Sequence, residues 1–185
     1  MVHIIRDSSE LQVKIDCYSV MLFKIAYLRL QNVQDAEDVV QEVFYQYIRH
    51  EEAFLSEEHE KAWLIKVTLN ACRKLWRSAW HRHRGGDIED MNKYGSDNAD
   101  NLIQGKAARN LEEEILKVEK GRLILQAVKA LPVKYRDVIH LFYYEDMCVK
   151  EIAKVTGRKE STVTSQLTRA RELLRKSLKE DYDFA

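Results

Sequence analysis

The chain has 185 residues, of which 45% are hydrophobic and 32% are charged, and its 30 Lys and Arg residues balance its 30 Asp and Glu residues. This composition is typical of a globular protein with one or two small domains. The sequence has neither an apolar run of about eighteen residues nor an N-terminal signal peptide, so we expect no stable membrane insertion and a cytoplasmic location.

Helical periodicity extends over nearly the whole sequence, which has no alternating strand pattern and a single proline. In the first half, apolar residues at helical spacing predict three long helices, around residues 11–26, 36–47 and 63–75, that pack as one bundle. The periodicity stops between Gly85 and Gly105, where Gly, Asp and Asn are concentrated. This segment is therefore predicted to be a flexible linker.

Helical pattern resumes near Leu111 and breaks at Leu131-Pro132, where proline can start a new helix. We therefore predict an all-α protein of two small helical domains joined by a flexible acidic linker. The predicted boundaries are residues 1–84, 85–108 and 109–185.

Residues 149–178 have the pattern of a helix-turn-helix, which places this motif in the C-terminal domain. Ile152 and Ala153 form an apolar patch on a short first helix, and Gly157 lies where the chain must turn tightly. Ser161 is a plausible N-cap for the second helix. The apolar stripe of that helix consists of Val163, Leu167, Ala170 and Leu174. An ordinary helical hairpin with a solvated polar face would show the same spacing. Spacing alone therefore does not distinguish a helix-turn-helix from such a hairpin, and other segments of the chain are needed.

The neutral net charge conceals a strong segregation of charge along the chain. Residues 1–60 contain five basic and twelve acidic residues, whereas residues 61–84 contain seven basic residues and no acidic one. Residues 148–179 contain nine basic and three acidic residues, and residues 85–119 contain four and nine. Two basic segments separated by an acidic one favour nucleic-acid binding, although solvated helix faces can also carry such charge runs.

Cysteines and histidines are the residues most often found in metal sites and disulfides. Cys17, Cys72 and Cys148 are odd in number, far apart and embedded in apolar helical pattern, so we predict that all three are small core residues. The histidines lack the spacing of known zinc motifs. We therefore predict no metal site and no cofactor.

Four segments in a fixed order point to a family. DAEDVVQEVF, which starts at Asp35, is followed by KAWLIKVTLNACRKLWR from Lys61, by the linker, and by LPVKYRDVIHLFYYED from Leu131. Together they resemble the extracytoplasmic-function (ECF) sigma factors of the sigma-70 family. This resemblance implies a non-enzymatic subunit of bacterial RNA polymerase. Its N-terminal domain, sigma region 2, would bind the core enzyme and open the minus-ten promoter element, and its C-terminal domain, region 4, would bind the minus-thirty-five element. An anti-sigma factor is implied as a further partner.

The resemblance assigns roles to the first two segments. In the first segment, Asp38, Gln41, Glu42 and Tyr45 share the helix face opposite Val39 and Val43. The implied core-polymerase docking residues are Asp35, Asp38, Gln41, Glu42 and Tyr45. The implied minus-ten DNA-binding residues combine cations with one amide: Lys61, Lys66, Asn70, Arg73, Lys74 and Arg77.

Aromatic residues and a loop accompany the second segment. The resemblance implies that the loop at residues 50–60 forms the pocket for a flipped base. We predict that Trp63 is a core residue. For Trp76 and Trp80, stacking on exposed bases and closing the end of the domain both remain open.

In the helix-turn-helix, the resemblance implies that short polar side chains and arginines bind the minus-thirty-five element in the major groove. These residues are Ser161, Thr162, Thr164, Ser165, Gln166, Thr168, Arg169 and Arg171. The family commonly has Gly-Thr-Val-Lys-Ser-Arg-Leu where this chain has Ser161-Thr162-Val163-Thr164-Ser165-Gln166-Leu167, so two cations are replaced and phosphate affinity should be lower. One hypothesis is that Gln166 contacts adenine.

Two other classes of protein fit the sequence less well. A dimeric helix-turn-helix transcriptional regulator would leave DAEDVVQEVF and the basic helix after Lys61 unexplained. A helical enzyme would need convergent titratable groups, and the stretch from His50 to Glu60 is the one segment rich enough in them; it has the composition of a solvated loop.

Overall fold

The computed structural model describes residues 8–82 and 111–182, and these ranges contain seven α-helices and no β-strand. They divide into two compact units. The prediction of an all-α chain with two helical domains is confirmed, whereas the predicted linker, residues 85–108, lies outside the described residues. No helix in the two described ranges has the length and apolar character needed to cross a membrane.

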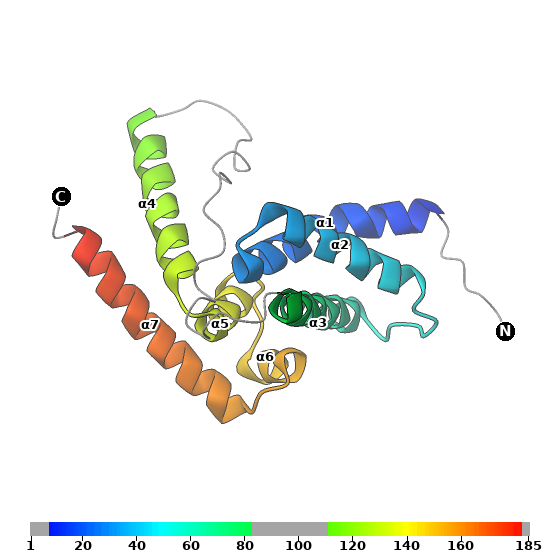
Figure 1. Ribbon diagram of the computed structural model, residues 1–185. Helices are drawn as coiled ribbons and strands as arrows, with labels where there is room; N and C mark the ends of the chain where they lie inside the picture. The colour runs from blue at the N-terminus through cyan, green and yellow to red at the C-terminus, as the bar shows by residue number, and fades with distance from the viewer. Residues whose placement is uncertain (1–7, 83–110, 183–185) are drawn as a thin grey trace. The chain divides into compact units, whose positions relative to one another are not determined.

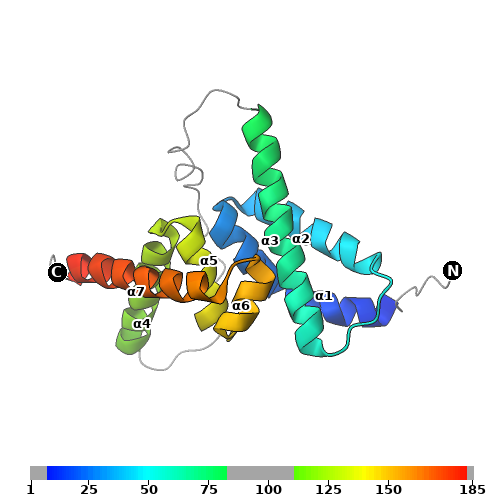
Figure 2. The same cartoon turned by 90° about the horizontal axis from the view of Figure 1, so that it is seen from below.

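The N-terminal unit is built on three helices, each of which packs against the other two. They are α1 (Ser8–Leu30), α2 (Val33–Ile48) and α3 (Glu57–Arg82). Figure 2 shows α3 crossing α1 and α2. Their apolar stripes meet in one core, which includes Leu22, Ala26, Val39, Val43, Tyr47, Leu64 and Cys72. The predicted three-helix bundle is thus confirmed.

Local signals fix the ends of these helices. The side-chain oxygen of Asn32 accepts a hydrogen bond from the Asp35 amide at 2.9 Å, which caps α2. Ser56 caps α3 in the same way, since its hydroxyl accepts from the His59 amide at 3.2 Å. Between α1 and α2 the chain turns at Gln31, whose φ is 55°. The starts of α2 and α3 are therefore both fixed by a capping side chain.

In the C-terminal unit, α7 (Glu160–Tyr182) packs against both α4 (Leu111–Ala130) and α5 (Val133–Tyr143). Figure 1 shows α7 running beside α4. The buried residues of this unit include Val128, Leu131, Val138, Leu141, Val163, Leu167 and Ala170. Pro132 immediately precedes α5, as predicted.

The helix-turn-helix contains α6 (Val149–Thr156), a tight turn and the start of α7. The Cys148 amide donates to the Glu151 carboxylate at 2.7 Å where α6 begins. Where α6 ends, Gly157 has a φ of 70° and the Arg158 amide donates to the Ala153 carbonyl at 3.0 Å, which is a Schellman motif. The predicted position of the turn is confirmed.

Two sequence-based predictions about small polar residues are wrong. Ser161 is not the N-cap of α7, because the helix begins at Glu160 and its first backbone hydrogen bond runs from the Val163 amide to the Lys159 carbonyl at 3.0 Å. Only Cys72 is a core residue; Cys17 and Cys148 are exposed free thiols. Cys17 lies on an outer face of α1, and Cys148 precedes the first turn of α6, so neither reaches a core.

Candidate nucleic-acid and protein interfaces

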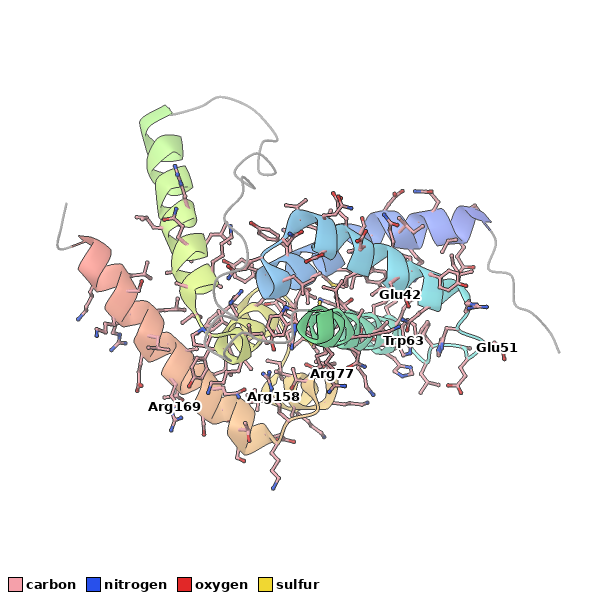
Figure 3. The ribbon with its side chains drawn as sticks, viewed as in Figure 1. Glu42, Glu51, Trp63, Arg77, Arg158 and Arg169 are labelled. Atoms are coloured by element: carbon pink, nitrogen blue, oxygen red, sulfur yellow. The ribbon has the colours of Figure 1, made fainter. Side chains whose placement is uncertain are left out.

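The outer face of α2 carries the acidic residues predicted for docking. Asp38, Gln41, Glu42 and Tyr45 are exposed, while Val39 and Val43 are buried on the other side of the helix. The Glu42 carboxylate accepts a hydrogen bond from Gln46 at 2.7 Å, within the same face. Figure 3 labels Glu42 on α2. Four predicted docking residues thus share one accessible surface.

Two residues change the outline of this surface. Asp35 is half-buried in the first turn of α2, where a carboxylate also favours the positive end of the helix dipole. Ile48 was missed in the sequence analysis, although it lies one turn beyond Tyr45 and is 49% exposed. An exposed isoleucine beside Tyr45 gives the acidic face an apolar end. Its spacing of three residues from Tyr45 was the signal that could have identified it.

One side of α3 carries the predicted cationic surface. Lys66, Asn70, Lys74 and Arg77 are exposed and Arg73 is half-buried, and their spacing of three, four and seven residues places them on one face. Nη1 of Arg73 donates to the side-chain oxygen of Asn70 at 2.8 Å. Because these side chains combine positive charge with an amide, they can bind both phosphate and base edges.

Lys61 does not share that face. Five residues separate Lys61 from Lys66, which is roughly 140° around an α-helix. Lys61 is half-buried, and the neighbouring Leu64 and Ile65 on its side of the helix are fully buried. The structure therefore separates Lys61 from the other five predicted minus-ten residues.

An aromatic cluster joins α3 to the loop between α2 and α3. The Phe54 ring stacks on His50 with centroids 4.8 Å apart and meets Trp63 edge-on at 5.6 Å. Tyr47 is also in reach, with its ring centroid 6.0 Å from that of Phe54. Figure 3 shows Trp63 on α3 and Glu51 in this loop. The cluster holds the middle of the loop against the bundle.

The tryptophans of α3 have different environments. Trp63 is half-buried and packs against the core, as predicted. Its spacing also places it on the same side of α3 as Lys66 and Asn70, which the sequence analysis did not notice. Trp76 packs against the core too, with the Arg29 guanidinium 5.9 Å from its ring centroid. The side chain of Trp80 lies outside the described part of the chain.

Glu60 is a buried carboxylate where a solvated loop was predicted. The stretch from His50 is a loop only as far as Ser56, and Glu60 lies in the first turns of α3 with 4% exposure. Its Oε2 accepts from Lys14 Nζ at 2.6 Å and from the Tyr18 hydroxyl at 3.3 Å, and its Oε1 accepts from the Tyr47 hydroxyl. One side chain of α3 thus bonds α1 and α2.

The charges of this network explain three shifted pKa values. Burial is the largest influence on Glu60 and opposes its ionisation, but the hydrogen bonds from Lys14 and Tyr47 and the charge of Lys14 outweigh it, so the pKa of Glu60 is lowered. The hydrogen bond that Lys14 donates to Glu60 raises the pKa of Lys14. Burial, followed by the charge of Glu60, raises the pKa of Tyr18 to about 12. At neutral pH the network therefore contains the Glu60–Lys14 ion pair and a neutral Tyr18.

On α7 the predicted DNA-binding side chains are mostly accessible. Seven of them are exposed and Gln166 is half-buried. The exposed residues are Ser161, Thr162, Thr164, Ser165, Thr168, Arg169 and Arg171. The buried stripe of Val163, Leu167 and Ala170 lies on the opposite side. Figure 3 shows Arg169 on α7, pointing away from α4 and α5.

Arg171 lies at the edge of this face and is held by α5. Its Nε donates to the Tyr143 hydroxyl at 2.8 Å, and its guanidinium lies 5.4 Å from the ring centroid of Phe142. The sequence could not show this contact, because the partners are 28 residues apart. Within the described residues, no cluster of His, Cys, Asp and Glu is arranged to hold a metal ion.

Comparison with known proteins agrees with this geometry. A family model for sigma-70 region 2 matches residues 15–82, and a model for sigma-70 region 4 matches residues 121–174, so that together they match more than half of the chain. The chain is 27% identical over 170 residues to the ECF RNA polymerase sigma factor SigW of Bacillus subtilis, covering 90% of this chain and 87% of that protein. It is 28% identical over 160 residues to the sigma factor SigV of the same organism, covering 86% of each.

A solved structure has the same fold. The sigma factor RpoE of Bartonella quintana, crystallised in complex with the anti-sigma factor NepR, matches with a TM-score of 0.63 at 18% identity, covering 92% of this chain and 97% of that one. Region 2 thus coincides with the bundle of α1, α2 and α3, and region 4 with the segment that contains the helix-turn-helix. The chain belongs to the sigma-70 family and is an RNA polymerase sigma factor of the ECF group.

Proposed function

We propose that this sigma factor binds bacterial RNA polymerase core through the outer face of α2 and directs it to promoters through α3 and α7. The observation that carries the proposal is the separation of charge on one bundle. An acidic face of exposed Asp38 and Glu42 stands on α2, and a basic face of exposed Lys66, Lys74 and Arg77 stands on α3. A protein partner and a nucleic-acid partner can then be bound by the same small domain without competing.

The proposed division of labour follows the predicted domains. Residues 1–84 form region 2, with Asp35, Asp38, Gln41, Glu42 and Tyr45 docking on the core enzyme. Residues 109–185 form region 4, and residues 85–108 connect the two. In region 4, the exposed face of α7 binds the minus-thirty-five element, with Arg171 at its edge. The proposal assigns no catalysis to the chain itself.

The basic face of α3 is proposed to capture the minus-ten strand after the duplex opens. Opening costs about 1.4 kcal/mol per base-pair step, so the bound single strand must return a comparable free energy through stacking and hydrogen bonds. Asn70 offers the amide, while Lys66, Lys74 and Arg77 offer the cations. Lys61, which lies on another side of α3, has the weakest support among the predicted DNA-binding residues.

An anti-sigma factor is proposed as a regulatory partner, acting with the sigma factor in the cytoplasm. The support is the solved RpoE structure, in which a sigma factor of the same fold is in complex with such a protein. In this chain, the acidic and apolar outer face of α2, which includes Tyr45 and Ile48, is a surface that an inhibitor could cover in order to exclude the core enzyme.

Run-off transcription with purified core polymerase and a panel of promoters tests the proposal. We expect promoter-specific transcripts only when the sigma factor is present. Glu42→Lys should abolish them by weakening core binding, whereas Glu10→Lys makes the same charge change at an exposed position of another helix, α1, and serves as the control. If both variants bound core polymerase as well as the wild type, the docking face would be wrongly placed. Duplex binding without any binding to core polymerase would instead favour a dimeric regulator.

A further inference from the structure

Glu60 lies at the end of the region 2 bundle where the loop of residues 49–56 leaves α2 and enters α3. Its two carboxylate oxygens bond residues of two different helices. Oε2 bonds Lys14 of α1, and Oε1 bonds the hydroxyl of Tyr47, in the last turn of α2. Because burying a carboxylate is costly unless its oxygens are paired, the bonds to Lys14 and to Tyr47 both stabilise Glu60 inside the bundle.

Tyr47, which bonds Oε1 of Glu60, also contacts the loop. The Tyr47 ring stacks on the ring of Phe54, with centroids 6.0 Å apart and planes 7° apart. Phe54 is a half-buried residue of the loop, whereas its neighbour Leu55 is 90% exposed. The Phe54 ring is the part of the loop that packs on Tyr47, and the Tyr47 hydroxyl in turn donates to Glu60. Glu60 can therefore influence the position of the loop through Tyr47.

The loop also contacts α3 directly, since the His50 ring lies 4.6 Å from Trp63 and the Phe54 ring 5.7 Å from His59. The Leu55 amide donates a long hydrogen bond of 3.3 Å to Nδ1 of His59, and the Phe54 ring contacts His50 and Trp63. His50 belongs to the loop itself. The ring of Tyr47 is thus one of the contacts by which the helical bundle fixes the loop.

We propose that Glu60 is a positioning residue that fixes the loop of residues 49–56 through Tyr47 and Phe54, and so sets the shape of the surface that meets the minus-ten element. The positioning step stands on the contacts above. Its consequence for promoter choice rests on the proposed function and adds to it that this loop, which joins the bundle next to α3, also takes part in promoter binding.

The two bonds of Glu60 can be removed one at a time, so its effect on the position of the loop can be separated from its effect on the stability of the bundle. Lys14→Met removes the ion pair and leaves the bond to Tyr47, so it should lower the melting temperature without loosening the loop. Tyr47→Phe removes only the hydroxyl that bonds Glu60 and keeps the ring. It should loosen the loop, because the ring on which Phe54 stacks loses its hydrogen bond to α3.

Hydrogen exchange of the full chain measures this directly, through the amides of residues 49–56. We expect exchange in this segment to rise about fivefold in Tyr47→Phe, the factor that loss of one ordinary hydrogen bond produces in a local opening equilibrium. Glu60→Ala should raise it at least as much, and Glu60→Gln, which keeps an acceptor for Tyr47, should restore part of the protection. Lys14→Met should leave the segment at the wild-type rate.

Unchanged loop exchange in Tyr47→Phe would overturn the proposal, and so would an equal rise in Lys14→Met. The tyrosine variant keeps the test decisive even if Glu60→Ala fails to fold. Run-off transcription from promoters that differ in the minus-ten element then tests the consequence. Faster loop exchange with altered promoter preference supports both steps. Faster exchange with unaltered preference supports positioning by Glu60 and rejects the promoter role of the loop.

Discussion

Arg73 donates a hydrogen bond from Nη1 to the side-chain oxygen of Asn70, 2.8 Å away and one turn earlier on α3. The bond orients the amide of Asn70, because it engages the carbonyl oxygen and leaves the two N–H donors on the other side of the group. Arg73 therefore helps to position Asn70 as well as adding positive charge. An amide held in this way is suited to bonding an acceptor on the edge of an exposed base.

Asn70 and Lys74 should have different effects on minus-ten binding. Asn70→Ala should weaken binding of the preferred sequence by about 1 kcal/mol and reduce discrimination between bases, with no change in salt dependence. Lys74→Ala should weaken binding of all sequences alike and flatten the slope of log affinity against log salt by about 0.7, the value for one phosphate of a single strand. Holoenzyme binding to single-stranded promoter fragments at several salt concentrations checks both. Equal salt slopes for the two variants would show that Lys74 makes no phosphate contact.

Acid should destabilise region 2 through Glu60. The pKa of Glu60 is lowered in the folded state, so its ionisation contributes stability above pH 4.5, its ordinary value, and that contribution is lost as the pH falls through the folded-state pKa. Glu60→Gln should cost about 1 to 2 kcal/mol at neutral pH and make stability less dependent on pH in the acid range. Urea denaturation across that range is the measurement. A steeper acid dependence in the variant than in the wild type would contradict the sign of the shift.

Gly157 and Gly121 form a matched pair for testing the turn of the helix-turn-helix. A Cβ at either position would meet no atom within 4 Å, so steric contact is the same for both, but only Gly157 has a positive φ, of 70°. Gly157→Ala should therefore destabilise by about 1 to 2 kcal/mol. Gly121→Ala, inside α4, should stabilise by about 0.5 to 1 kcal/mol. Thermal denaturation compares the two, and destabilisation by both would mean that α4 needs its glycine.

The features predicted from the sequence are those that repeat at helical spacing. The apolar stripes of α2 and α3, the exposed positions of Glu42 and Asn70, and the glycine turn before α7 all follow from local periodicity. Burial of Glu60 does not, because its partner Lys14 is 46 residues away and belongs to another helix. A carboxylate among other Glu and His residues has the pattern of a solvated loop until the folded bundle supplies the donors.

The positions of individual cations also show what local sequence can and cannot predict. Composition grouped Lys61 with the basic residues after it, but counting residues around the helix separates it from Lys66. This difference in position could have been predicted from the sequence. The contact of Arg171 with α5 could not, because it depends on how α7 packs against α5.

Arg171 should contribute less than Arg169 to the salt dependence of minus-thirty-five binding. Arg169 is exposed and opposite the buried stripe, whereas Arg171 is held by the Tyr143 hydroxyl and the ring of Phe142. Arg169→Ala should flatten the salt slope by about 0.9, the value for one phosphate contact with duplex DNA. Arg171→Ala should change the slope less while still lowering affinity, because α7 loses a contact with α5. Holoenzyme binding to duplexes that carry the minus-thirty-five element, measured at several salt concentrations, gives both slopes. Tyr143→Phe is the control: it keeps both arginines and should lower affinity with an unchanged slope. If Arg171→Ala flattened the slope as much as Arg169→Ala, Arg171 would leave α5 and bind phosphate in the complex.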